Sequence, residues 1–300
     1  MILREFDSYE TVIGRMYGGA TGSKIAVKFR DKVWMLKSCQ NLKLKEYHNV
    51  EISYANDPVT EYIGSHIYGL VGIPVHETVL GLYHGKLSVL CSDKAFPNKL
   101  YEFREFRNNL MCPDIVQSSS GMSTELSDIF EIIEKFPYLD KESVYTRFWQ
   151  MFVIDALIGN TDRNNGNWGF LLKDNKFELY DVYDCGACLN NKRSEAQMLE
   201  DIKSGRLESI AFNYTFNYRE NKKRINPFKF IERHLDNPYI RETLDLINNI
   251  DFNDIEKLLN SLRPVITETQ ENWYCSILRL RYDRLKDLSN KRLSTLKSLL

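Results

Sequence analysis

The stretch that decides the predicted fold is Ile158-Gly159-Asn160-Thr161-Asp162-Arg163-Asn164-Asn165-Gly166-Asn167. The segment before it, Phe148–Ile158, is apolar almost all round, which indicates a helix buried in a core. The residues after it predict a β-hairpin, with strands at Trp168–Leu172 and Phe177–Tyr183 around a polar turn. The decisive stretch is therefore expected to be a loop that leaves a buried helix and enters a hairpin.

Three side chains in and after this loop suggest a shared chemistry. Asp162 and Asn167 lie five residues apart on the loop, and Asp184 follows the hairpin in Tyr183-Asp184-Cys185-Gly186. Because two antiparallel strands return the chain to where it started, we expect Asp184 to lie beside Asn167. In phosphoryl transfer, one carboxylate orients the attacking hydroxyl and accepts its proton, the role predicted for Asp162. An amide oxygen and a second carboxylate hold Mg²⁺ against the phosphates, as predicted for Asn167 and Asp184.

Ordinary turns are the simpler explanation for any one of these residues, since Asn, Asp and Gly dominate turns for conformational reasons. The order of the whole set is harder to explain in that way. A buried helix, a D-x-x-x-x-N loop, a hairpin and a D-x-G turn follow one another along the chain. This order favours a phosphotransferase.

The N-terminal part of the chain predicts a small sheet and one helix. Apolar runs at Ile25–Phe29 and Val33–Lys37 flank a short charged turn, which is typical of a β-hairpin. A helix is expected to begin at about Pro58, followed by two strands at Thr78–Tyr83 and Lys86–Cys91. The predicted fold is therefore α+β and bilobal, like that of protein kinases.

The two lobes are predicted to meet near residue 92. Residues 1–92 would form the N-lobe, with the antiparallel sheet, a glycine-rich loop and one helix. Residues 93–300 would form a mainly helical C-lobe, with the catalytic loop, the D-x-G turn and four or five further helices after Pro227. The hinge is expected in the change of composition around residues 91–98.

The N-terminal part also supplies candidate phosphate contacts. Backbone N–H groups of a glycine-rich segment can approach phosphate oxygens without a side-chain clash. Lys37 ends a strand, where its ammonium could neutralise phosphates, and Glu61 on the following helix could hold that ammonium in place. A surface turn, a solvated lysine and a surface glutamate are the alternatives. The residues of the glycine-rich segment are Gly18, Gly19, Ala20, Thr21, Gly22 and Ser23.

Composition excludes some other classes. Forty basic residues face 41 acidic ones, so the chain lacks the positive charge of a typical nucleic-acid binder. Six scattered cysteines do not make a disulfide scaffold, and Cys185 and Cys188 are expected to be packing groups rather than a zinc or redox pair. No apolar run reaches the roughly 18 residues of a membrane span, and no secretion signal is visible. We expect a cytoplasmic protein of a bacterium, with export to a host cell as the alternative.

At this point the sequence resembles a known family. The run from Asp155 to Arg163, then Asn167-Trp168-Gly169-Phe170-Leu171, then Tyr183-Asp184-Cys185-Gly186 is similar to the HipA-like serine/threonine kinases. Glu61-Tyr62-Ile63 and Gly72-Ile73-Pro74 resemble the N-lobe of the same family. Because the stretch ahead of the glycine-rich segment is short, we expect no counterpart of the extra N-terminal subdomain of the full-length toxin. The resemblance is therefore closer to the compact CtkA-type branch.

The resemblance implies a protein kinase that uses ATP and Mg²⁺, with Asp162 as base and with Asn167 and Asp184 as metal ligands. It implies that Lys37 contacts the phosphates and that the backbone of Leu90 or Cys91 meets the adenine at the hinge. The acceptor would be a protein with a Ser or Thr hydroxyl, and a cognate antitoxin or a host protein is a further candidate partner. A lipid or small-molecule kinase and a non-catalytic nucleotide-binding pseudokinase remain the alternatives.

The sequence departs from the family pattern at two positions. Asn164 stands two residues after the predicted base, where the toxin carries His, so that imidazole is missing here. The serine that the toxin phosphorylates in itself falls at Tyr17 by register with Lys24. Autophosphorylation is therefore left open between Tyr17, Thr21, Ser23 and a later loop.

Overall fold

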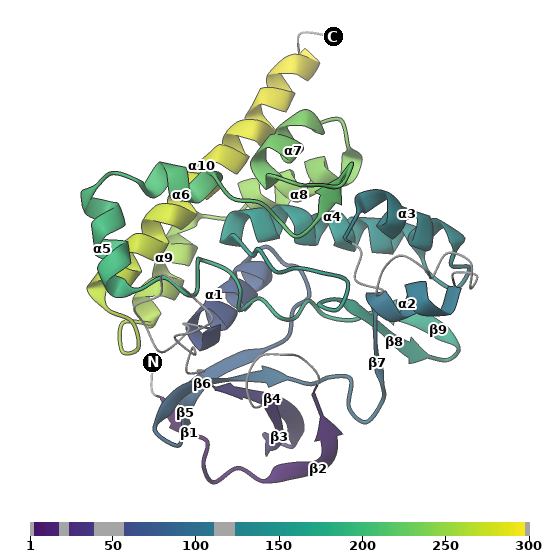
Figure 1. Cartoon of the computed structure of the whole chain (residues 1–300), viewed down its shortest axis with the longest axis vertical. Helices are drawn as coiled ribbons and strands as arrows, with labels where there is room; N and C mark the ends of the chain where they lie inside the picture. The colour runs from purple at the N-terminus through teal and green to yellow at the C-terminus, as the bar shows by residue number, and fades with distance from the viewer. Residues whose placement is uncertain (1–2, 18–23, 39–56, 111–123, 298–300) are drawn as a thin grey trace.

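The computed structural model describes residues 3–17, 24–38, 57–110 and 124–297. A mainly antiparallel sheet lies at one end of the molecule and helices form the other end, with helix α1 (Asp57–Leu70) between them (Figure 1). This α+β arrangement confirms the predicted fold class. The predicted glycine-rich segment, 18–23, lies outside the described residues.

The N-terminal sheet has six strands in the order β1-β5-β6-β4-β3-β2. β1 runs parallel to β5, and the other neighbours are antiparallel. Two hairpins, β3–β4 and β5–β6, lie where the sequence predicted them. The strands are β1 (Arg4–Glu5), β2 (Thr11–Met16), β3 (Lys24–Phe29), β4 (Lys32–Ser38), β5 (Thr78–Tyr83) and β6 (Lys86–Ser92).

The turn between β3 and β4 shows why this hairpin forms. Arg30 and Asp31 have φ values of 50° and 57°, so both central residues are left-handed, as the twist of a two-residue hairpin favours. Buried side chains of the two strands, among them Phe29 and Trp34, then pack with Phe6 and Leu90 in a core of their own. The sheet thereby has a hydrophobic interior on one face.

A second, three-stranded sheet lies beside the helices. It has the order β7-β8-β9, with β7 (Leu100–Glu102), β8 (Gly169–Lys173) and β9 (Lys176–Leu179). The hairpin β8–β9 was predicted, and β7 is an addition to it. Gly169 is required here because a Cβ at this position would lie 2.2 Å from the carbonyl oxygen of Tyr101.

Helix α4 (Lys141–Ile158) is the centre of the helical part. It is buried on nearly all sides and contacts α1, α3, α7, α8 and α10. Within the described residues no helix is both long and apolar enough to cross a membrane. The remaining helices and one short hairpin are α2 (Phe103–Leu110), α3 (Leu126–Lys135), α5 (Glu195–Lys203), α6 (Leu207–Phe212), α7 (Pro227–Arg233), α8 (Pro238–Asn248), α9 (Phe252–Ser261), α10 (Glu268–Lys297), β10 (Arg219–Glu220) and β11 (Lys223–Arg224).

Gly159 ends α4 and starts the decisive loop. Its φ is 68°, and its N–H donates to the carbonyl of Asp155, a left-handed helix end that favours glycine. An added Cβ would also lie 2.3 Å from the guanidinium of Arg281. The loop therefore leaves a rigid, buried helix in a defined direction.

The predicted division at residues 92 and 93 stays a prediction. β6 ends at Ser92, in the expected hinge region. Apolar side chains of α1, such as Ile63 and Ile67, nevertheless share one core with α4.

Candidate active site

Lys37, at the end of β4, contacts two carboxylates. Its Nζ lies 3.2 Å from Oε2 of Glu61 on α1 and 3.2 Å from Oδ1 of Asp184. Lys37 is only 6% exposed and Glu61 only 1%. Burial alone would lower the pKa of Lys37, but Asp184 and Glu61 raise it well above its usual value. A charged ammonium is therefore held between the sheet, α1 and the D-x-G turn.

Glu61 is positioned by more than this lysine. Its Oε1 accepts the backbone N–H of Cys185 at 2.8 Å and lies 3.1 Å from Nε2 of His76. Burial would raise the pKa of the Glu61 carboxyl, but Lys37, His76 and the Cys185 N–H together lower it below its usual range. Glu61 is thus ionised, and its carboxylate contacts Lys37, His76 and the Cys185 N–H.

Asp184 reaches Lys37 through an unusual backbone conformation. Its φ is 57°, in the left-handed region that Asp tolerates better than most residues. Gly186 follows closely, and a Cβ there would lie 3.0 Å from both Glu61 Oε2 and Lys37 Nζ. Glycine at this position therefore leaves the charged pair in place, whereas a larger residue would press on it.

Hydrogen bonds from Arg163 hold the predicted catalytic loop in place. Its Nε and Nη2 donate to the two oxygens of Asp155 at 2.8 and 3.1 Å, and both residues are almost fully buried. Its Nη1 donates to the carbonyls of Asn167 and Tyr183, at 2.9 and 2.5 Å. One side chain therefore joins the end of α4, the loop and the residue before Asp184.

Asp162 lies on this loop with its carboxylate partly exposed to the site. Its Oδ1 accepts a hydrogen bond of 3.0 Å from Nδ2 of Asn217, and its carbonyl accepts one of 3.2 Å from Nδ2 of Asn167. Burial and the negative charge of Asp184 raise the pKa of Asp162 above its ordinary value, and the bond from Asn217 opposes this rise. Asp162 is therefore a stronger base than an exposed aspartate.

Two cavities meet at these carboxylates. The first has a volume of about 500 Å³ and lies between the sheet and the helical part. Its lining includes Met35, Cys91, Ser92 and Asp93 from the sheet side and Asp162, Asn167, Tyr183 and Asp184 from the other. The second has a volume of about 680 Å³, and its lining includes Lys37, Asp162, Asp184, Asn217 and Arg224. Asp162 and Asp184 line both, so two ligands could meet there.

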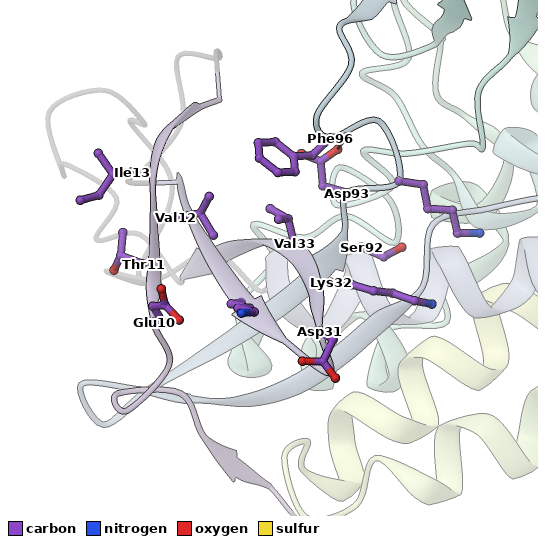
Figure 2. Close-up of a pocket in the computed structure, with 12 residues that line it drawn as sticks. Glu10, Thr11, Val12, Ile13, Asp31, Lys32, Val33, Ser92, Asp93 and Phe96 are labelled. Carbon is purple, nitrogen blue, oxygen red and sulfur yellow. Dashed lines mark hydrogen bonds between the residues drawn. The ribbon is translucent and has the colours of Figure 1, made fainter. Parts of the chain in front are cut away.

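A third cavity, of about 730 Å³, lies between β2, the β3–β4 turn and the segment after β6, near the expected hinge. Figure 2 shows Val12 pointing toward Val33, while Ile13 points away from the opening. Ser92 and Asp93 line it as well as the 500 Å³ cavity. Its lining includes none of the predicted catalytic or metal-binding residues, so its larger volume does not make it the active site.

The structure brings most of the predicted site residues together. Lys37, Glu61, Asp162, Asn167 and Asp184 converge around the two cavities described above. The two candidates for the adenine contact are separated. Cys91 lines the 500 Å³ cavity, whereas Leu90 is fully buried in the core of the sheet and does not line it.

Sequence reasoning assigned no role to four residues that shape the site. Asp155 and Arg163 stood in the motif that carried the resemblance, but their pairing is visible only in space. His76 had no assigned role, and it contacts Glu61. Asn217 is 55 residues from Asp162, and no local pattern connects them.

The oxygen donors at the site fit a hard divalent cation. The carboxylate of Asp184 is 36% exposed. Asn167 donates with Nδ2, and within the described part of the chain nothing donates to its Oδ1. Carboxylate and amide oxygens are the ligands that Mg²⁺ takes in phosphoryl-transfer sites. These two residues could hold the ion at the junction of the two cavities.

Comparisons with known proteins give a consistent result. No protein-family model matches the chain. A curated relative, the serine/threonine-protein kinase CtkA of Helicobacter pylori strain J99, is 30% identical over 281 residues, which cover 92% of this chain and 84% of the relative. A crystal structure of a Helicobacter pylori proinflammatory kinase CtkA superposes with a TM-score of 0.85 at 26% identity, covering 97% of this chain and 98% of that one.

A more distant structural likeness concerns the fold alone. HipA of Shewanella oneidensis MR-1, solved with HipB and operator DNA, superposes with a TM-score of 0.55 at 13% identity. The match covers 91% of this chain and 68% of that one.

Proposed function

The chain belongs to the HipA-like serine/threonine protein kinases, in their CtkA branch, and we propose that it transfers the γ-phosphate of ATP to protein hydroxyls with the help of Mg²⁺. In this proposal Asp162 orients the acceptor hydroxyl, Asn167 and Asp184 hold the metal, and Lys37 binds the phosphates. A cognate antitoxin and autophosphorylation stay predictions.

The observation that carries the proposal is the pair of contacts at 3.2 Å from Lys37 to Glu61 and to Asp184. The ammonium is charged and lines the 680 Å³ cavity. Its partner Asp184 also lines the 500 Å³ cavity, where a nucleotide would place its phosphates. Hydrogen bonds from the Cys185 N–H and to His76 also hold the carboxylate of Glu61 in position beside the lysine. An active kinase needs this lysine–glutamate pair in place.

The two cavities support a division of labour. The 500 Å³ cavity takes the nucleotide, because it extends from Met35 and Cys91 of the sheet to the oxygen donors of Asn167 and Asp184. The 680 Å³ cavity takes the acceptor, because it opens onto Asp162 from the side of Asn217 and Arg224. Bound Mg²⁺ would offset the charge of the phosphate oxygens. Asp162 would accept the hydroxyl proton, and its raised pKa makes it the better base.

The test is a transfer assay with labelled ATP, Mg²⁺ and a cell lysate, read by identifying the labelled polypeptides. Asp162→Asn should lower transfer by about 10²- to 10⁴-fold, the usual contribution of a positioned base. Calorimetric titration should show little change in nucleotide affinity, since Asp162 acts on the acceptor. Asp184→Asn should instead weaken binding of Mg²⁺ with ATP.

The matched control is Asp174→Asn. Asp174 lies exposed in the β8–β9 turn with a φ of 48°, a conformation that Asn also adopts. It should behave as the unaltered protein in both measurements. Undiminished transfer in Asp162→Asn, or unchanged affinity in Asp184→Asn, would remove that residue from its proposed role.

A further inference from the structure

Three side chains with potential metal-ligand atoms lie close together beside the 500 Å³ cavity. Glu61, His76 and Cys91 each place one ligand atom so that the three atoms lie within 4.8 Å of one another. All three residues are buried, with exposures of 1%, 3% and 1%. They come from α1, the segment before β5, and β6, three separate parts of the chain.

The sheet register explains why these groups meet. Cys91 pairs with Met35 on β4, so Lys37, two residues on, lies on the same face of the sheet as Cys91. Cys91 also pairs with Thr78 on β5, two residues after His76. The thiol and the imidazole therefore reach the place where Lys37 meets Glu61.

The chemistry of the three ligand groups indicates which metal would bind. A carboxylate, an imidazole and a thiolate together suit Zn²⁺, whereas Mg²⁺ prefers oxygen ligands alone. Bond lengths of about 2.0–2.3 Å in a tetrahedral site put ligand atoms about 3.5 Å apart. Since the three atoms lie within 4.8 Å of one another, the widest gap must close by at most about 1.3 Å. Three protein ligands leave a fourth position, and His76 and Cys91 both line the 500 Å³ cavity, which gives the ion a path of entry.

Charge balance also favours a divalent ion. The carboxylate and a thiolate together neutralise Zn²⁺, while Lys37 keeps Asp184 as its partner. Burial and the carboxylate of Glu61 raise the pKa of the Cys91 thiol well above its usual value, so the thiol is protonated without metal. Binding would release that proton to solvent as the sulfur–metal bond forms.

We propose that Glu61, His76 and Cys91 form an inhibitory Zn²⁺ site. The ion takes the carboxylate of Glu61 as a ligand and so competes with Lys37 for it. Because the lysine–glutamate pair is needed in the active kinase, zinc binding and phosphoryl transfer exclude each other. This inference rests on the proposed function for its effect on activity, but the site itself does not depend on that function.

The binding test uses Co²⁺ as a spectroscopic probe of the protein. A cobalt–thiolate bond gives a charge-transfer absorption in the near ultraviolet, and Zn²⁺ should abolish it by competition. Cys91→Ser should lose this absorption. His76→Gln should weaken binding by at least about 10-fold, the loss that even an outer-shell partner of a metal causes. Circular dichroism confirms that each variant is folded.

The activity test measures inhibition by buffered free Zn²⁺ at a fixed excess of Mg²⁺ and ATP. Each variant is compared with its own rate without zinc. Cys91→Ser and His76→Gln should need at least about 10-fold more zinc for half-inhibition. Cys275→Ser, which removes a half-buried thiol on α10, should match the unaltered protein in both tests.

Three results would overturn the proposal: no charge-transfer absorption in the unaltered protein, its loss in Cys275→Ser, or unchanged zinc inhibition in both ligand variants. The last result would place zinc at Asn167 and Asp184 instead. If the chain transferred no phosphate at all, the proposed function would fail, while the cobalt spectrum would still decide the metal site.

Discussion

The Asp155–Arg163 pair at the end of α4 and the Lys37–Asp184 pair at the end of β4 differ in how completely their partners are used. In the first, the side chains are 0% and 1% exposed, and five donated hydrogen bonds of 2.5–3.7 Å leave Arg163. In the second, the side chain of Lys37 is also buried, with 7% exposed, but the carboxylate of Asp184 is 36% exposed and lines two cavities.

This difference distinguishes an ion pair that only stabilises the fold from one that can bind a ligand. A buried pair with all its hydrogen bonds made has no capacity left for a ligand, so it can only hold the backbone in place. A pair with one open carboxylate can exchange partners when a cation or phosphate arrives. The chain thus places a closed ion pair behind its catalytic loop and an open one in front of it.

The largest effect is expected from breaking the closed pair. Arg163→Met leaves the Asp155 carboxylate buried without its cation, which costs about 3–5 kcal/mol of unfolding free energy. Urea denaturation measures this loss. Arg284→Met, which removes an arginine from a half-exposed pair with Glu232, is the matched control and should cost no more than about 1 kcal/mol. Equal losses in the two variants would mean that the buried pair is not structural.

The next effect should separate activity from stability. Lys37→Met removes the ammonium that contacts Asp184 and lines the 680 Å³ cavity. We expect transfer to fall by about 10²- to 10³-fold, the usual cost of losing one electrostatic donor. The loss of unfolding free energy should be smaller than in Arg163→Met, because Glu61 keeps the Cys185 N–H and His76. A transfer assay and urea denaturation on the same preparation make the comparison.

A near-normal rate in Lys37→Met would make Lys37 a structural residue. A stability loss as large as that of Arg163→Met would remove the distinction between the two pairs. Lys32→Met is the matched control, since Lys32 lies on the same strand with its side chain 63% exposed. It should leave both rate and stability unchanged.

The same contrast explains what the sequence could predict. The two hairpins of the N-terminal sheet and the hairpin β8–β9 have strong local patterns, and all were predicted. Helix α4 was predicted over Phe148–Ile158, and the structure extends it back to Lys141. β2 was missed because its side chains are largely exposed on both faces and Gly14 interrupts it with a φ of 89°. β1 has only two residues and forms by pairing with β5, which no local pattern reveals.

The candidate site shows the same difference between local patterns and long-range contacts. Asp162, Asn167 and Asp184 share one motif with fixed spacing, so their convergence could be inferred from a single helix, loop and hairpin. His76 and Asn217 reach the site from distant segments, and only the folded chain shows their contacts with Glu61 and Asp162. Long-range polar contacts carry no periodicity, and this is why they escaped prediction.

The smallest expected effect concerns Asp162 and the dependence of the transfer rate on pH. Asp162 must be ionised to accept a proton, so transfer should decline as the pH falls through its pKa, which burial and Asp184 raise. The hydrogen bond from Asn217 lowers that pKa. Asn217→Ala should therefore move the acid limb of the rate profile to higher pH, with the rate at neutral pH changed least.

Removing the opposing influence should move the limb the other way. Asp184→Asn takes away the negative charge that raises the pKa of Asp162, so the residual activity of this variant should decline at lower pH than that of the unaltered protein. Rate profiles at saturating Mg²⁺ and ATP measure both shifts. Limbs that moved together, or did not move, would show that a group other than Asp162 controls the acid side. Opposite shifts are expected if Asp184 and Asn217, which act on Asp162 in opposite directions, set the basicity of the site.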